Sequence, residues 1–392
     1  EIGSGLVGSE MCIRDRVDQI LSQRREDGLW GNFHALSCPV PGRNYTTEQA
    51  IRRLYYLGYT AEDEVIQPVL KRMEQCITGE LDIDSYSEKK HDWIFFEKLM
   101  LAAWLRIFEP QNETALEVAY QWAQIVEKAF ASGSYSVADD IAAFTEWKGR
   151  KPKSGFETGF GMFYHAALLP GVLSPKTEDL FLDYYLSKPD GMYYIYDKPL
   201  NQLPETFASR KSSCYIAAIE VLSRYDLAKE KLTFVMDWIN ANRNENGQWD
   251  FGEKAKDGVY FPLSDRWDKT TRIADSTYRI SKLFGLPCYC GHDCSKCVTY
   301  IATQTDNDDL RRQAQSFYKE RFGLDIPLEK FYCDGGRSEN VFELCKECPF
   351  KKCCIERGID ACSKCSEYPC KDISDYQEKY VNKSNQLENK VK

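Results

Sequence analysis

The sequence has few histidines and no long apolar run. Its 392 residues include only four histidines, at positions 34, 91, 165 and 292. No apolar run approaches the roughly 20 residues that a membrane-spanning helix needs. The first sixteen residues also lack the basic start and the apolar centre of a secretory signal. We therefore expect a soluble, cytoplasmic protein without a membrane span.

Cysteine is scarce in the first 287 residues, which hold four of the sixteen cysteines. The other twelve follow Pro287. A chain of this length usually has more than one core, so the cysteine boundary divides a helical domain (17–286) from a cysteine-rich domain (287–372) and a polar tail (373–392). We interpret residues 1–16, EIGSGLVGSEMCIRDR, as non-native because they look like translated sequencing-adapter read-through.

A basic surplus is missing as well. The net charge is −9, and by our count residues 286–392 carry 17 basic and 18 acidic side chains. Cysteine modules that bind nucleic acid usually carry a basic surplus, so we expect no nucleic-acid partner. In a reducing compartment, clustered cysteines are more often metal ligands than disulfides. A secreted disulfide scaffold that has lost its leader is the alternative.

Apolar residues recur with helical period before residue 286. The segments from Leu116 to Phe130 and from Leu232 to Ile239 each form an apolar stripe. Thr46 and Thr47 supply a capping hydroxyl, and Glu48 is a first-turn carboxylate. We predict a mainly α domain with about ten to twelve helices.

Four short segments repeat the pattern Asp or Asn, Gly, any residue, then Trp or Tyr. They are Asp27–Trp30, Asp190–Tyr193, Asn246–Trp249 and Asp257–Tyr260. We expect turns in which Gly adopts positive φ, Asp binds its own backbone, and the aromatic ring fills the space between helices. Such repeats suggest stacked helical hairpins, although four ordinary turns would share the pattern.

Two of these turns, EDGLWGNF and ENGQWDFG, resemble the Gln-Trp-type repeats of the α/α-toroid superfamily, which includes terpenoid cyclases and protein prenyltransferase β-subunits. The resemblance implies an α/α toroid of inner and outer helices around a central cavity. The cyclase acid motif is matched only by Asp306-Asn307-Asp308-Asp309, outside this domain, where it is typical of an acidic helix start. The Asp-x-Cys pair of the prenyltransferase zinc site does not occur in this domain. Neither family activity keeps its signature residues.

Two polar clusters are weak candidates for catalytic residues in the cavity. One contains His91 and Asp92, and the other contains Asp265 and Asp275. A histidine beside an aspartate can act as a base held by a carboxylate. The alternatives are a helix cap with a packed imidazole and, for Asp275 with Arg279, a helix-surface ion pair.

Three Cys-x-x-Cys pairs stand out after Pro287. Two residues between cysteines let both sulfurs approach one ion from a tight turn, and two such turns complete a tetrahedral zinc site. We predict as ligands Cys290, Cys294, Cys297, Cys333, Cys345, Cys348, Cys353, Cys362, Cys365 and Cys370. An iron–sulfur cluster remains an alternative to Zn²⁺, because four thiolates suit either. The first three cysteines also match the spacing of radical S-adenosylmethionine enzymes, but the chain that follows is too short for that barrel.

The cysteine-rich domain resembles a family of small prokaryotic cysteine-rich domains of unknown function. CGHDCSKCVTYIA and CKECPFKKCCIERGIDACSKCSEYPC carry the resemblance, which implies metal binding. Where that family shows Cys-x-Gly-Cys, this chain has Cys333-Asp334-Gly335-Gly336. One ligand is therefore missing, and a site either borrows Cys288 or Cys354 or is incomplete.

These patterns predict a metal-binding protein whose helical toroid binds a small molecule or a protein partner, with a structural zinc module attached. One alternative is a toroid-class enzyme, a lyase or a cyclase- or prenyltransferase-like protein that uses the central cavity. A second alternative is an iron–sulfur or redox protein in which the cysteines are the working part.

Overall fold

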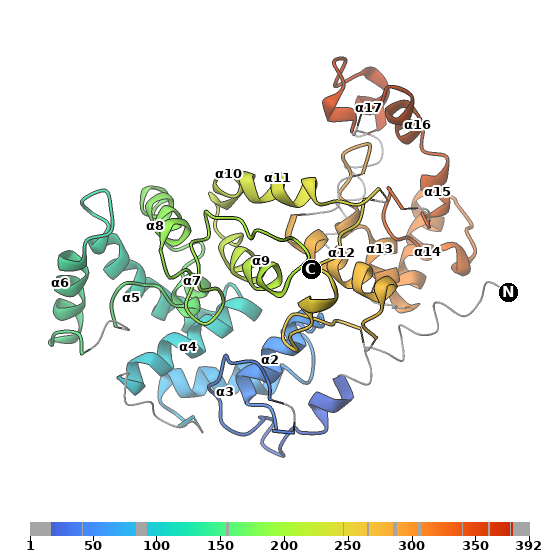
Figure 1. Ribbon diagram of the computed structural model, residues 1–392. Coiled ribbons are helices and arrows are strands. Elements are labelled where there is room, and N and C mark those ends of the chain that lie inside the picture. Colours follow the sequence, from blue (N-terminus) through green and yellow to red (C-terminus); the bar gives the residue numbers. More distant parts are fainter. Residues whose placement is uncertain are drawn as a thin grey trace. The chain divides into compact units, whose positions relative to one another are not determined.

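Helices dominate the computed structural model (Figure 1). It describes residues 17–40, 42–83, 92–153, 157–245, 247–264, 266–284, 288–304, 308–338, 340–359, 361–376 and 378. Over these ranges there is no strand, and isolated bridges pair Met162 with Tyr193 and Met192 with Tyr196. The mainly α class is confirmed, while the toroid arrangement stays a prediction.

The chain forms two compact units. Unit 1 comprises the chain up to Ala241 together with Phe251–Arg272, and unit 2 comprises Asn242–Asp250 together with the chain from Ile273 onward. Helices of unit 1 include α2 (Thr47–Tyr56), α3 (Gln67–Thr78), α4 (Trp93–Phe108), α5 (Glu113–Ala129), α6 (Val137–Lys148), α7 (Phe163–Leu168), α8 (Pro175–Ser187), α9 (Arg210–Leu222), α10 (Ala228–Lys231), α11 (Thr233–Ala241) and the 3-10 turn η1 (Glu253–Ala255).

Helix α12 (Lys269–Phe284) begins in unit 1 and continues in unit 2. The remaining elements of unit 2 are short. They are η2 (Cys294–Lys296), α13 (Val298–Gln304), α14 (Asp308–Phe322), η3 (Leu328–Lys330), α15 (Glu343–Lys346), α16 (Pro349–Glu356), η4 (Cys362–Lys364) and α17 (Lys371–Tyr376).

Helix α4 lies at the centre of unit 1 and packs against α3, α5 and α7 (Figure 1). Ten of the 16 residues of α4 are buried, and they lie on every side of the helix. This pattern is expected for a helix that is apolar all round. On α5 the predicted stripe is confirmed, because Ala119, Trp122 and Val126 are buried. Unit 1 therefore has a continuous helical core.

Helix α2 begins where the sequence predicts. The Thr46 side chain accepts a hydrogen bond from the Gln49 backbone, and the Gln49 side chain accepts one from the Thr46 backbone. This reciprocal capping box satisfies two backbone donors at the helix start. The turn prediction also holds at Gly28 and Gly258, which have φ of 84° and 76°.

The expected backbone contacts of the repeated turns are present. The Asp27 carboxylate accepts from the Leu29 backbone at 3.1 Å, and the Asp257 carboxylate accepts from the Val259 backbone at 2.8 Å. Trp30 is buried as predicted. At Tyr193 the prediction of a buried ring is wrong, because its side chain is 46% exposed.

Two further sequence expectations concern the remaining turn and the acidic run. Asn246 lies outside the described residues, whereas Gly247 has φ of 74° and Trp249 is buried. Helix α14 begins at Asp308, and its first-turn acids Asp308 and Asp309 each pair with an arginine three residues later. The acidic helix start is thus confirmed for the described part of the run.

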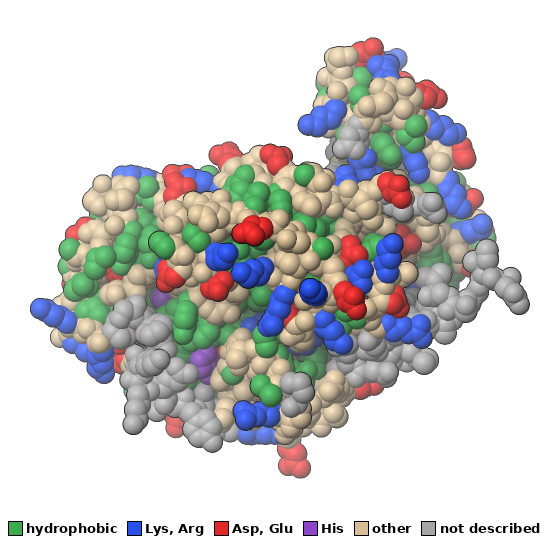
Figure 2. Space-filling model, viewed as in Figure 1, with side chains coloured by type: hydrophobic (Ala, Val, Ile, Leu, Met, Phe, Trp, Pro, Cys, Tyr) green, Lys and Arg blue, Asp and Glu red, His purple; other side chains and the backbone are tan. Residues whose placement is uncertain are grey.

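Charge is mixed over the surface. On the face shown in Figure 2, basic and acidic side chains are interspersed, and neither sign forms a continuous field. Among the helices that the structure describes, none combines the length and the apolar character needed to cross a bilayer.

Candidate functional site

The three Cys-x-x-Cys segments of unit 2 form the tight turns that the spacing predicts. In each of them the backbone N–H of the second cysteine donates to the carbonyl of the first. The distances are 3.0 Å for Cys294/Cys297, 3.4 Å for Cys345/Cys348 and 3.0 Å for Cys362/Cys365. A turn of this kind points both side chains of a pair toward the same side of the backbone, as a metal-binding knuckle requires.

A first sulfur group consists of Cys288, Cys290 and Cys294. The sulfurs of Cys288 and Cys290 are 3.1 Å apart, and the Gly336 backbone N–H donates to the Cys294 sulfur at 3.3 Å. Hydrogen bonds from Cys290 and Cys294 lower the pKa of Cys288, and the same bonds together with burial raise the pKa of both partners. Ionisation of Cys288 therefore opposes ionisation of the other two thiols.

A second sulfur group consists of Cys354 and Cys362, whose sulfurs are 3.7 Å apart. Both belong to a small core with Phe350 and Ile373, against which Cys288, Tyr289 and Cys348 also pack. A core this small is built largely from cysteine side chains.

The other predicted ligands are more dispersed. Cys333 belongs to a separate core with Phe331 and Phe342. Burial opposes ionisation of Cys297, but the hydrogen bond and the charge of His292 outweigh it and lower the pKa of Cys297. Among the predicted ligands, Cys345, Cys353 and Cys370 are exposed. Within the described residues, no three His, Cys, Asp or Glu side chains converge closely enough to hold one ion as they stand.

The region that holds these cysteines has a family match. Residues 286–375 match DUF3795, a family described as a protein of unknown function. Comparison of the chain with curated proteins and with solved structures gave no match. The DUF3795 match covers the turns and both sulfur groups, so the cysteine-rich region is a recognisable module, while the toroid resemblance of the preceding region stays a prediction.

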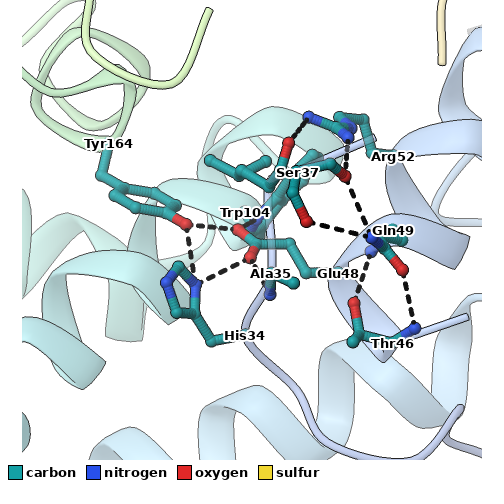
Figure 3. Close-up of polar contacts among 10 residues, drawn as sticks. His34, Ala35, Ser37, Thr46, Glu48, Gln49, Arg52, Trp104 and Tyr164 are labelled. Carbon is teal, nitrogen blue, oxygen red and sulfur yellow. Dashed lines mark hydrogen bonds and ion pairs between the residues drawn. The ribbon is translucent and has the colours of Figure 1, made fainter. Parts of the chain in front are cut away.

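Unit 1 contains a buried polar cluster centred on Glu48 (Figure 3). Its carboxylate is fully buried and accepts hydrogen bonds from four groups. The donors are Trp104 Nε1 at 2.7 Å, Tyr164 Oη at 2.6 Å, the Ala35 backbone N–H at 2.9 Å and His34 Nδ1 at 2.9 Å. We call these five residues the Glu48 cluster.

Every group facing Glu48 is a donor, so the carboxylate has the acceptor role throughout. Burial raises the pKa of Tyr164 well above its usual range, and the charge of Glu48 raises it further, so the hydroxyl keeps its proton and donates. Nδ1 of His34 accordingly carries a hydrogen toward Glu48. In the neutral imidazole this assignment leaves the lone pair on Nε2.

The ring of His34 packs against a residue that lines a pocket. Its centroid is 5.9 Å from that of Tyr194, which lines a pocket of about 420 Å³ together with Arg210 and Cys214. Tyr194 has φ of 80°, a conformation that costs backbone energy for a residue other than glycine. Arg210 donates to the sulfur of Cys38 at 3.2 Å, so the segment of residues 34–38 contacts two of the residues that line the pocket.

Sequence analysis missed this cluster. It assigned Glu48 only as a first-turn carboxylate, and it gave His34 no role. The first-turn position is correct, but the side chain turns into the core instead of toward solvent. Nothing in the sequence pairs residue 48 with Tyr164, which lies 116 positions away.

The candidates that sequence analysis did name lie elsewhere. Asp92 is the N-cap residue of α4 and pairs with Arg150 at 2.6 Å and with Lys153 at 3.6 Å. Burial opposes ionisation of Asp92, but Arg150 and Lys153 outweigh it and lower its pKa. His91 and Asp265 lie outside the described residues.

Asp275 and Arg279 lie on α12 in unit 2 and are both buried, at 7% and 3% exposure. The interpretation of this pair as a helix-surface ion pair is therefore wrong. A core-facing acid and base on one helix are costly unless their polar groups are satisfied.

Proposed function

We propose that the DUF3795 module binds Zn²⁺ through cysteine thiolates and that the ion stabilises its fold. The observation that carries this proposal is the set of three Cys-x-x-Cys turns, each closed by a backbone hydrogen bond. Thiolates from two such turns suit a tetrahedral zinc site, and an iron–sulfur cluster would use the same ligands. The predicted ligands remain Cys290, Cys294, Cys297, Cys333, Cys345, Cys348, Cys353, Cys362, Cys365 and Cys370.

The sulfur spacing supports the proposal. In a tetrahedral site with bonds of about 2.3 Å, neighbouring sulfurs lie about 3.8 Å apart. The Cys354 and Cys362 sulfurs are 3.7 Å apart in a buried core, so Cys354 joins the candidate ligands. Each sulfur turns about a single side-chain bond, which lets a ligand set close around an ion without displacing its backbone turn.

Metal binding compensates for the small apolar core of this module. Few large apolar residues are available to it, and metal ligation supplies folding free energy that such a core lacks. A structural role, as opposed to a redox role, predicts that bound metal protects the thiols from mild oxidants.

Elemental analysis of the full-length protein, purified without oxygen, tests the proposal. We expect zinc in a fixed ratio to protein, no visible absorption, and thiols that react only after a chelator is added. Iron with inorganic sulfide and a brown colour would support the cluster instead. A protein with no bound metal and freely reactive thiols would contradict metal binding altogether.

We further propose that unit 1, as a helical toroid, binds a small molecule in the pocket lined by Tyr194, with His34 as a positioning residue that packs against the Tyr194 ring. The Glu48 cluster supports this role because it fixes the imidazole through Nδ1. The aromatic rings of Trp93, Phe96 and Tyr194 surround the imidazole and limit its access to water.

Thermal-shift screening of a metabolite library against the full-length protein tests this second proposal. Ligands that stabilise the wild type are expected to lose their effect in Tyr194→Ala and to keep it in the exposed control Glu62→Gln. Such ligands should also bind His34→Gln more weakly, because the imidazole packs against the Tyr194 ring. Ligands that bind Tyr194→Ala equally well would place binding elsewhere.

A further inference from the structure

Gly336 lies against the first sulfur group. A Cβ atom at residue 336 would be 2.7 Å from the Cβ of Cys288 and 3.4 Å from the sulfur of Cys294. Real Cβ atoms do not approach other carbons that closely, so the space for a side chain at residue 336 is already filled by Cys288. The backbone of Gly336 still takes part in the group, because its N–H donates to the Cys294 sulfur.

The turn that carries Cys288 is fixed by its own backbone hydrogen bonds, and a contact between neighbouring residues links it to the segment of residue 336. The Cys288 backbone N–H donates to the carbonyl of His292 at 2.9 Å, and the Cys288 carbonyl accepts from Gly291 at 3.0 Å. On the neighbouring residues, the guanidinium of Arg337 lies 4.4 Å from the ring centre of Tyr289. The approach of residue 336 to residue 288 is thus part of a packed arrangement.

The sulfur of Cys288 points into the group. It lies 3.1 Å from the Cys290 sulfur and 3.5 Å from the position of a Cβ at residue 336. A cysteine at residue 336 would direct its sulfur from that same region. Only one of residues 288 and 336 can therefore supply a side chain there.

We infer that Cys288 is a metal ligand that occupies the place of a cysteine at residue 336, in one site with Cys290 and Cys294. This inference rests on the metal binding proposed above. It adds a ligand outside the ten predicted from spacing, and it chooses between the two residues, Cys288 and Cys354, that could replace the missing cysteine. It also explains why residue 336 is a glycine, since any side chain there would displace Cys288.

A ligand swap in the full-length protein tests the inference, with Zn²⁺ and Co²⁺ as probes. The variants are Cys288→Ser, Gly336→Ala, Gly336→Cys with Cys288→Gly, which removes the obstructing Cβ, and the matched thiol control Cys38→Ser. Zinc affinity is measured by competition with a chromophoric chelator. The sulfur-to-cobalt charge-transfer absorbance per cobalt reports the number of thiolates, and circular dichroism verifies that each variant is folded.

We expect Cys288→Ser to weaken zinc binding at one site at least tenfold and to lower the charge-transfer absorbance of that site by about one quarter, as for one of four ligands. Gly336→Ala should weaken the same site although every sulfur is present. The double variant should restore the absorbance, and Cys38→Ser should match the wild type.

The inference and the proposed function fail in different ways. A wild type that binds neither probe contradicts metal binding itself. A wild type that binds metal while Cys288→Ser keeps full affinity and full absorbance overturns the ligand assignment alone. If the double variant does not regain the zinc affinity and the absorbance that Cys288→Ser loses, the exchange of a ligand between residues 288 and 336 is overturned.

Discussion

Oε2 of Glu48 lies 2.9 Å from Nδ1 of His34, and the carboxylate is held in place by three further donors from separate parts of unit 1. Its donors come from the loop before α2, from α4 and from α7. The pair therefore joins three segments of the core and also fixes the orientation of the imidazole that packs against Tyr194.

Glu48→Ala is expected to lower the free energy of unfolding by about 3 kcal/mol or more. The substitution removes the acceptor of Trp104 Nε1 and the carboxylate acceptor of the Tyr164 hydroxyl, whose other neighbour is His34 Nδ1 at 3.2 Å, and a buried group left unsatisfied costs about 1–3 kcal/mol. Urea denaturation followed by circular dichroism measures the change. The exposed Glu62→Ala is the matched control, and equal stabilities of the two variants would show that the cluster contributes little.

His165 predicts a dependence of stability on pH. It is buried between Trp122 and Phe160, and among the described residues neither ring nitrogen has a hydrogen-bond partner. Burial lowers its pKa from 6.5 to about 3. Between these values the unfolded chain binds a proton that the folded chain does not, so stability falls as pH drops from 6.5 toward 3, with a slope of up to about 1.4 kcal/mol per pH unit.

His165→Leu should remove that part of the slope and leave stability at pH 7 within about 1.5 kcal/mol of the wild type, because it exchanges one buried side chain for an apolar one of similar size. Urea midpoints measured at pH 7.5, 6 and 5 for both proteins check this. If the stabilities of the wild type and His165→Leu change with pH in parallel, His165 does not cause the pH dependence.

Arg53 connects distant parts of unit 1. Its buried guanidinium donates to the carbonyl of Val259 at 3.0 Å and to that of Pro262. Arg53→Met keeps the apolar stem but leaves both carbonyls unsatisfied, so we expect a loss of roughly 2 to 4 kcal/mol in unfolding free energy. Thermal and urea unfolding measure the loss, and Arg43→Met at an exposed position should change stability little.

Metal removal should destabilise the DUF3795 module. Free zinc at 100 times its Kd adds about 2.7 kcal/mol to the stability of a folded state that alone binds it. Excess EDTA is therefore expected to lower the temperature of a calorimetric unfolding transition. EDTA already saturated with zinc should leave that temperature unchanged. A melting profile that is the same with both forms would argue against a structural ion.

Local features of the fold were predictable because short-range geometry decides them. The capping box at Thr46 and Gln49 follows from side chains three residues apart, and the positive φ of Gly28 follows from the turn that contains it. Long-range features were not. The exposed ring of Tyr193 departs from the expected repeat because the adjacent Met192 is the residue that enters the core.

The sequence by itself determined the mainly helical class, the position of the cysteine-rich module and its three Cys-x-x-Cys turns, since hydrophobic period and residue spacing act over a few neighbouring residues. Only the tertiary structure decided that Glu48 faces His34 and Tyr164, and that Cys288 fills the space at Gly336. Those residues lie far apart along the chain, and the packing of whole segments brings them into contact.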